Sequence, residues 1–398
     1  MIKQLLKKKE FRNFLFADII SGFGVGMTTV GANWYILSQT HSNKIVGLYL
    51  TINVLAGFIM SPFAGAITDH FTRLKVILWS FIGRLFPIII IAIYFYFWGF
   101  NIILMYLLSI VMGMGWITYM SASRSYVQSI LPEKFLGSGN SFIEISLQVG
   151  MFSAGAISGM ILNYTGFFTI LIINVLVFIV AVILISNIKS DVKVNIDNQN
   201  EKSQILEGIK YIWNNKLIFN IGLLSILPLI VTQLFNVSAP DYVSSILSSN
   251  SVVYGLSDMS YGIGGLLAGF LTNYLINRFS NKKLITKFFA LASFVLILLY
   301  FGRSILIMYL CNFCLGLSNS SLRVFLNTFL MHLVKKTFMG RVTSICNGLS
   351  QLIEVFASTL MGIFNDKLGA DFGFLVMSII MIIGIFYSIV GINNKAEA

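Results

Sequence analysis

The segment Gly65-Ala-Ile-Thr-Asp-His-Phe-Thr-Arg-Leu-Lys75 is a short polar interruption between two long apolar blocks, 45–67 and 75–97. A helix needs about 20 residues to cross a bilayer core of about 30 Å, and each block reaches that length. A soluble protein would instead show alternating or amphipathic apolar positions. The pattern therefore predicts two membrane helices joined by a tight polar loop.

The same pattern extends over the whole chain. Of its 398 residues, 57% are hydrophobic and only 11% are charged, whereas soluble domains carry about 25% charged residues. The first apolar run follows a basic N-terminus and is too long for a signal peptide, so we expect it to remain as a helix. We predict an all-α membrane protein with twelve transmembrane helices, near 14–37, 45–67, 75–97, 102–123, 141–162, 167–186, 217–240, 252–276, 284–302, 304–327, 342–364 and 372–393.

Basic residues gather in alternate loops of this prediction. With the N-terminus inside, 22 of the 27 lysines and arginines fall in cytoplasmic segments and three fall outside. Positive charge is retained on the cytoplasmic side of membranes. We therefore expect a multi-pass protein of the cell (inner or plasma) membrane with both termini cytoplasmic. The net charge of +12 reflects this orientation, and we expect no nucleic-acid partner.

The longest polar stretch, 187–216, separates six predicted helices from six more. We expect an N-terminal half over 1–190, a cytoplasmic linker over 191–216 and a C-terminal half over 217–398. Within the linker, Ile205, Ile209 and Ile212 follow a helical spacing. This spacing fits an amphipathic helix on the membrane surface and a solvated linker equally well.

The two halves share an internal repeat. A shift of 203 positions superimposes glycine, serine and glutamine residues in corresponding helices and loops. A repeat of this kind predicts two pseudo-symmetric halves and a transporter whose site lies between them. The matched pairs are Gly113 with Gly316, Gly137 with Gly340, Ser141 with Ser344, Gln148 with Gln351, Gly159 with Gly362, and Gly166 with Gly369.

Glu354 is the leading functional candidate because it lies near the middle of the span 342–364. An ionisable side chain inside a span costs roughly 2.5–3.5 kcal/mol on insertion scales, which marks it as functional by default. We expect Glu354 to alternate between binding a proton and binding a polar or cationic substrate. The other candidates are polar residues that share helix faces: Asn347 and Gln351 beside Glu354, Glu144 and Gln148 at the repeat-related positions, and Asn312, Asn319 and Arg323 on the tenth span. For these residues, hydrogen bonding between helices is the alternative role.

Four further charged residues are expected to be structural. Asp18 lies near the start of the first span and is expected to cap a neighbouring helix. Arg84, in the middle of the third span, is expected to pair with an acid. Asp241 and Asp258 flank the outer loop after the seventh span, either as an outer-gate pair or as solvated helix ends, and we favour solvated ends.

The loop quoted above is similar to the signature loop of the major facilitator superfamily, with Gly65, then Asp69, then Arg73 and Lys75. In that family the glycine permits close helix approach, and the charged groups at the cytoplasmic rim act in gating. Thr72 replaces an expected second glycine. His70 replaces an expected arginine, and the second half has lost the acidic residue.

Span 141–162 carries Gly150, Gly155 and Gly159, which resembles the glycine-rich helix of proton-coupled exporters in this superfamily; ordinary small-residue packing is the alternative. Over its whole length the chain most resembles the macrolide-efflux-like drug/proton antiporter branch. The stretches that carry this likeness are Phe11-Arg-Asn-Phe-Leu, Leu131-Pro-Glu, Glu207-Gly-Ile-Lys and Gly340-Arg-Val. The resemblance implies alternating access and multidrug or metabolite efflux.

We therefore expect a proton-coupled exporter of amphipathic small molecules that works as a monomer in the lipid bilayer. A siderophore or lipid exporter, a proton-coupled importer of the same fold and, remotely, a non-transporting receptor or scaffold remain alternatives. There is no GxxxxGK[ST] motif for an ATP-driven pump. The three histidines lie near span ends without clustered ligands, so we expect no enzyme, no cofactor and no metal site.

Overall fold

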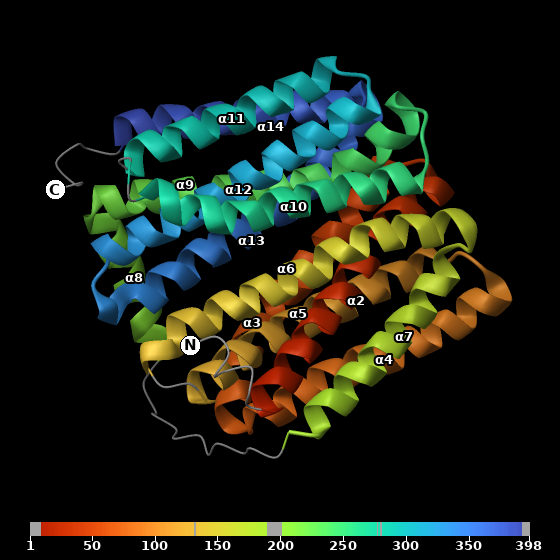
Figure 1. Ribbon diagram of the computed structural model, residues 1–398, viewed down its shortest axis with the longest axis horizontal. Helices are drawn as coiled ribbons and strands as arrows, with labels where there is room; N and C mark the ends of the chain where they lie inside the picture. The colour runs from red at the N-terminus through yellow and green to blue at the C-terminus, as the bar shows by residue number, and fades with distance from the viewer. Residues whose placement is uncertain (1–8, 131–132, 189–200, 277, 279–280, 392–398) are drawn as a thin grey trace. The chain divides into compact units, whose positions relative to one another are not determined.

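The computed structural model (Figure 1) describes residues 9–130, 133–188, 201–276, 278 and 281–391. These described residues form thirteen α-helices and one π-helix, with no strand among them. The helices are α2 (Lys9–Thr40), α3 (Asn43–His70), α4 (Arg73–Trp98), α5 (Ile102–Ile130), α6 (Glu133–Tyr164), α7 (Phe167–Ser186), α8 (Glu201–Asn214), α9 (Lys216–Asp241), the π-helix η1 (Tyr242–Ile246), α10 (Ser251–Ile276), α11 (Asn281–Phe301), α12 (Ile305–Leu333), α13 (Lys336–Leu368) and α14 (Ala370–Gly391).

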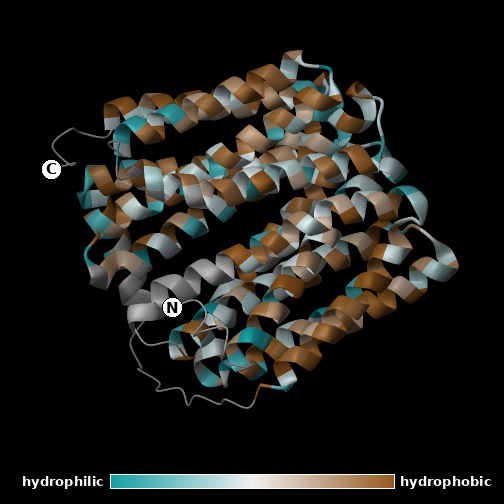
Figure 2. Ribbon diagram, viewed as in Figure 1, coloured by the Kyte–Doolittle hydropathy of each residue, from teal (hydrophilic) through white to brown (hydrophobic). Residues whose placement is uncertain are grey.

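Ten helical segments in the described part of the chain are long and apolar enough to cross a membrane. The helices α10 and α13 are also long enough to cross, and each has an acidic residue well inside it, Asp258 in α10 and Glu354 in α13. In Figure 2, α7 and α14 are largely hydrophobic in colour, whereas α13 is visibly mixed. Together these helices form the predicted twelve, and in the sequence the short helix α8 follows the first six and precedes the last six.

The first compact unit consists of Met1–His41, Tyr49–Asp197 and Asn250–Met259. In this unit α2 packs against α6 and α7, and α4 packs against α5 and α7. A polar contact joins α3 to α5 in the same unit, where the Asn53 amide donates to the backbone oxygen of Ser109 at 3.0 Å. The residues 250–259 belong to α10, whose first turns therefore pack with this unit.

The second compact unit consists of Ser42–Leu48, Asn198–Ser249 and Ser260–Ala398. Here α11 packs against α12 and α14, while α9 packs against α12, α13 and α14. Helix α8 lies against α13, where the rings of Tyr211 and Phe338 stack with centroids 4.4 Å apart. The linker segment with apolar residues at Ile205, Ile209 and Ile212 is therefore helical, and it contacts α13 of this unit.

The first turn of α3 is capped by a carboxylate from α13. Asp366 accepts hydrogen bonds from the backbone nitrogens of Asn43 at 2.6 Å and Lys44 at 3.1 Å, and from the Ser42 hydroxyl at 2.7 Å. The first backbone N–H groups of a helix have no partner within the helix, and a carboxylate satisfies them well. This cap joins Ser42–Leu48 to the second unit.

Repeat-related glycines have the same roles in the two units, which confirms the pseudo-symmetry. A side chain at Gly113 would collide with backbone of α3, and one at Gly316 would collide with backbone of α10. Gly166 follows α6 with φ of 82°, and Gly369 follows α13 with φ of 98°. Residues with a side chain disfavour these positive φ values. Glycine is therefore the residue suited to end each helix in this conformation.

Candidate functional site

Glu354 lies halfway along α13 and is partly buried. The Ser350 hydroxyl, one turn earlier, donates to its carboxylate at 2.6 Å. The Ser358 hydroxyl, one turn later, donates to the backbone oxygen of Glu354 at 2.7 Å. A neutral hydroxyl can support either protonation state of a carboxyl group. This environment therefore leaves Glu354 able to hold or release a proton.

Arg323 on α12 interacts electrostatically with the Glu354 carboxylate. Arg323 is exposed, and it follows Asn319 by one helical turn on the same helix. The described structure thus brings together an acid, a guanidinium and an amide from two helices of the second unit. Such a set can exchange a proton and hydrogen bond to a polar ligand.

Asn319 belongs to a polar cluster built by three helices. Its side-chain amide donates to the hydroxyls of Thr232 on α9, at 3.2 Å, and of Tyr261 on α10, at 3.3 Å. Those two hydroxyls are also hydrogen bonded to each other at 3.1 Å. Asn319 is 1% exposed, and no described residue hydrogen bonds to its side-chain oxygen. The cluster holds the helices together and leaves one buried acceptor open.

Asn347 and Gln351 extend the polar stripe of α13 beyond Glu354. Asn347 is exposed and Gln351 is partly exposed, so both amides are accessible. In the first unit, Gln148 is partly buried on α6. The side chain of Glu144, its expected companion, lies outside the described residues. The predicted stripe is therefore visible in full only on α13.

The three glycines of α6 are packing positions in the first unit. A side chain at Gly150 would collide with backbone of α2, and one at Gly159 would collide with the backbone oxygen of Ser251 on α10. Gly155 lies against Gly255 of α10 in the same way. The Ser251 hydroxyl donates to the Gly159 oxygen at 2.8 Å. These contacts are the small-residue packing that allows two membrane helices to approach closely.

The predicted gating loop joins α3 to α4. Arg73 begins α4 and donates to the Ser125 hydroxyl of α5 at 2.9 Å, while Lys75 is exposed. No described atom lies within 4 Å of the position that a side chain at Gly65 would occupy, so the close helix approach expected there is not seen among the described residues. The side chain of Asp69 lies outside them.

Sequence reasoning underestimated Asp18. This residue is fully buried in α2, where the hydroxyls of Tyr119 on α5 and Ser146 on α6 donate to its two carboxylate oxygens. Its two hydroxyl partners come from the middle of neighbouring helices, whereas we expected Asp18 to cap the end of one. A stronger signal was available, since a carboxylate within an apolar run needs partners from neighbouring helices.

Arg84 on α4 is the cation of the same cluster. It is fully buried, with its guanidinium carbon 4.6 Å from the ring centroid of Phe178 and 5.3 Å from that of Phe81. Tyr119 interacts electrostatically with both Asp18 and Arg84. The terminal nitrogens of Arg84 have no hydrogen-bond acceptor among the described residues. The phenol thus lies between opposite charges in the membrane part of the first unit.

The two outer aspartates differ from each other. Asp241 accepts hydrogen bonds from Asn43 at 2.7 Å and Ser245 at 2.5 Å, close to the end of α9. Asp258 lies two turns inside α10 and is half-buried, so the expectation of a solvated helix end is wrong for it. The observed helix, Ser251–Ile276, agrees with the predicted span 252–276 to one residue, so Asp258 lies inside the span and not at its end.

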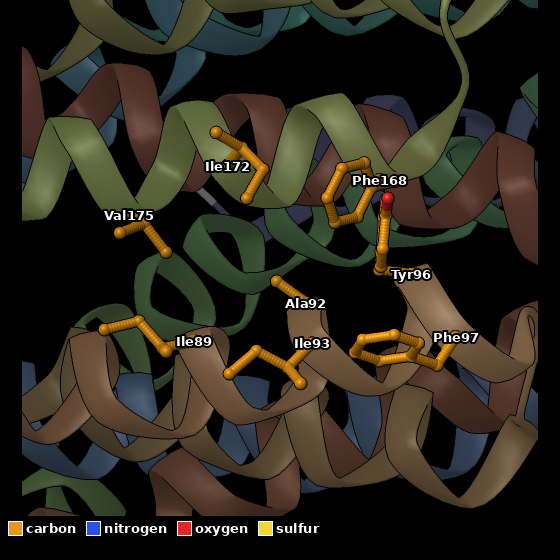
Figure 3. A pocket seen from close by; sticks show the side chains of 8 residues that line it. All are labelled: Ile89, Ala92, Ile93, Tyr96, Phe97, Phe168, Ile172 and Val175. Atoms are coloured by element: carbon orange, nitrogen blue, oxygen red, sulfur yellow. The ribbon is translucent and has the colours of Figure 1, made fainter.

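An apolar groove of about 350 Å³ lies between α4 and α7 in the first unit (Figure 3). It is lined by Ile89, Ala92, Ile93, Tyr96, Phe97, Phe168, Ile172 and Val175. Tyr96 and Phe97 are mostly exposed, as expected of side chains that face lipid. None of the predicted site residues lines this groove. Among the described residues, no group of three histidine, cysteine, aspartate or glutamate side chains is placed to hold a metal.

Comparison with known proteins gives a family match. The model of the Major Facilitator Superfamily matches residues 14–234 and 221–396. The structure is similar to that of a bacterial homolog of the human lysosomal transporter Spinster, in an inward-facing and unoccupied conformation, with a TM-score of 0.79 and 11% identity over 98% of each chain. It is also similar to a D-xylose-proton symporter, with a TM-score of 0.75 and 14% identity over 95% of each chain. No curated protein matches the sequence. At these identities the structural neighbours show the fold alone.

Proposed function

The chain belongs to the major facilitator superfamily of membrane transporters, and from this premise we propose that it is a proton-coupled exporter of amphipathic small molecules, of the macrolide-efflux-like kind. The observation that carries the proposal is Glu354, a partly buried carboxyl group in the middle of α13 with a hydroxyl donor and a guanidinium nearby. An ionisable group at this depth raises the free energy of insertion into the membrane, so its presence marks a functional candidate.

In this proposal Glu354 is the residue that exchanges protons. Asn347, Gln351 and Asn319 supply hydrogen bonds for the polar part of a substrate, and Arg323 returns the carboxyl group to its ionised form by its positive charge. One proton that enters the cell down a membrane potential of 100 mV contributes about 2.3 kcal/mol to the movement of a substrate in the opposite direction. Alternating access of the two halves, 1–190 and 217–398, would couple the two movements.

The proposed setting is the cell membrane, with both termini and the linker 191–216 in the cytoplasm. The distribution of lysine and arginine supports this orientation. Helix α8, within the linker, exposes Ile209 and Trp213, which supports a position at the membrane surface. The loop containing Gly65, Asp69, Arg73 and Lys75 would then act at the cytoplasmic rim.

The test uses everted membrane vesicles with an acid interior and a pH-sensitive dye, to which macrolides, dye cations and siderophores are added in turn. We expect at least one compound to dissipate the pH gradient with the wild-type protein and not with Glu354→Gln. The matched control is Asp371→Asn, because Asp371 lies at the first turn of α14 and contacts the backbone nitrogen of Phe372 at 3.1 Å. This control should behave as wild type.

Three results would count against the proposal. Unchanged dissipation in Glu354→Gln would exclude this carboxyl group as the proton carrier. A response seen only in right-side-out vesicles would favour the importer of the same fold. A response to siderophores alone would favour the alternative of a siderophore exporter.

A further inference from the structure

Helix α8 is attached to the second unit by one of its sides. Tyr211 stacks on Phe338 of α13, and its hydroxyl accepts a hydrogen bond from the backbone nitrogen of Lys335 at 3.4 Å. Glu207, one turn earlier on α8, forms an ion pair with Arg341 at 2.7 Å. The helix therefore lies against the ends of α9 and α13 with a defined rotation about its axis (Figure 1). These contacts determine which residues of α8 face away from the unit.

A different side of α8 is apolar at two positions one turn apart. Ile209 is 46% exposed and Trp213 is 74% exposed. The Trp213 ring contacts that of Phe219 edge to face, with centroids 5.7 Å apart. Phe219 lies in the first turn of the candidate membrane span Lys216–Ile246, so the indole is at the level where this span enters the membrane. Tryptophan favours this level because its ring is apolar and its N–H group is polar.

Cations accompany this apolar side. Lys210 on α8 and Lys216 at the start of α9 are both exposed. Among the described side chains of α8, Glu207 is the only acid, and Arg341 compensates its charge. Exposed lysines beside an exposed tryptophan attract negative charge at the boundary between membrane and water. Zwitterionic lipid headgroups carry no net charge, so they would not satisfy this attraction.

We propose that α8 is a binding surface for anionic phospholipid, with phosphatidylglycerol as the probe that tests it. Lys210 and Lys216 bind the negatively charged headgroup, and each ammonium group supplies three hydrogen-bond donors for its phosphate oxygens. Ile209 and Trp213 enter the boundary between headgroups and acyl chains. The inference goes beyond the proposed function, because it depends neither on the substrate nor on the direction of transport.

Membrane orientation alone is the competing explanation of the lysines. Positive charge gathers in the loops on one side of a membrane protein whether or not it binds a particular lipid. This preference accounts for Lys210 and Lys216. It does not account for an exposed indole beside them, which contacts the first turn of a span. The combination of charge and ring is what favours a lipid-binding surface.

The test is hydrogen–deuterium exchange of the full-length protein in lipid nanodiscs. One set contains phosphatidylcholine alone, and the other contains phosphatidylcholine mixed with phosphatidylglycerol. We expect the backbone amides of 207–214 to exchange about tenfold more slowly in the mixture, since a ligand at about ten times its half-saturating level protects the bound state by that factor. High salt should reverse the slowing, because it screens exposed charges.

Lys210→Gln combined with Lys216→Gln removes both cations of the surface. Two lysines near an anionic membrane contribute about 10- to 30-fold to affinity, so the slowing should fall to about twofold or less. The matched control is Lys44→Gln combined with Lys367→Gln, which removes two exposed lysines from the same unit. Lys367 lies near the other end of α13, roughly 40 Å from Arg341 at 1.5 Å per residue. This control should keep the full slowing.

Trp213→Leu tests the apolar part of the surface, because it keeps an apolar side chain and removes the indole. Exchange of 207–214 should become faster in both lipid compositions, and the difference between the compositions should remain. Unchanged exchange would contradict the role given to the indole. Equal elution volume and melting temperature in phosphatidylcholine must accompany every variant.

Three results would overturn the inference. The first is equal exchange of the wild type in the two lipid compositions, and the second is full slowing in the variant that lacks Lys210 and Lys216. The third is loss of slowing in the control variant to the same extent, because this would show an effect of net charge without a site. None of these measurements involves transport, so their failure is distinct from a failure of the proposed function.

Discussion

The buried cluster of Asp18, Tyr119 and Arg84 provides the sharpest prediction. Asp18 and Arg84 are both fully buried, and Tyr119 interacts with each of them. We expect Asp18→Asn to destabilise the protein by about 1–3 kcal/mol, because it replaces the charged acceptor of two buried hydroxyl hydrogen bonds with an amide. Arg84→Met should have an effect of the same order, since it removes the guanidinium whose charge acts on the Tyr119 phenol.

The double variant tests whether the effects of the two charges on stability are coupled. Asp18→Asn combined with Arg84→Met removes both charges that act on the Tyr119 phenol, and residues that share a partner usually have coupled effects on stability. We therefore expect the double variant to lose less stability than the sum of the two single variants. The coupling energy should be about 2 kcal/mol or more, whereas distant, independent sites add to within about 0.5 kcal/mol.

The controls separate charge from hydrogen bonding. Ser146→Ala removes one hydroxyl from Asp18 and no charge, so it should cost about 1 kcal/mol. Tyr119→Phe keeps the ring beside Arg84 and removes the bridging hydroxyl, for which about 1–3 kcal/mol is expected. Unfolding by SDS in dodecylmaltoside micelles, followed by far-UV circular dichroism, measures all of these. Additive losses in the double variant would refute the charge coupling.

Three further predictions concern helix contacts and use the same unfolding assay. Gly159→Val should cost about 1–3 kcal/mol because the new side chain would collide with the Ser251 oxygen; an unchanged midpoint would argue against close packing of α6 and α10. Asp366→Ala removes the cap of α3 and should cost about 1 kcal/mol, a loss that Asp366→Asn should reduce. Arg341→Gln breaks the 2.7 Å ion pair with Glu207, which is exposed, so a loss of more than about 1 kcal/mol would contradict our account of it.

Most of the fold was accessible from the sequence because the membrane constrains it strongly. Backbone polar groups must be paired within each apolar segment, so such segments are helices. Their number and separation follow from the length of the apolar runs. The repeat was also visible, because glycines such as Gly113 and Gly316 meet the same steric demand in both halves. Burial was less accessible: Asp258 was expected to be a solvated helix end although it falls within the predicted span 252–276, and the structure places it two turns inside α10.

The candidate site was accessible only in part. Glu354 could be found from its position in an apolar segment. Its electrostatic contact with Arg323 could not be found in this way, because that contact depends on how α12 and α13 pack. The cluster of Asn319 with Thr232 and Tyr261 likewise joins three helices that are distant in the chain. Spacing along one helix shows which residues share a face, but it does not show which face of another helix they meet.

Composition and hydropathy by themselves determined that this is a twelve-helix membrane protein with two related halves, because the free energy of placing each segment in lipid is a local property of that segment. Tertiary structure alone decided which charges are compensated. Asp18 has two hydroxyls and a nearby guanidinium, whereas Asp258 has aromatic rings and no partner among the described residues, although both are aspartates within apolar helices. The physical reason is that electrostatic compensation in a low-dielectric core depends on contacts between helices, and these are not encoded in any one of them.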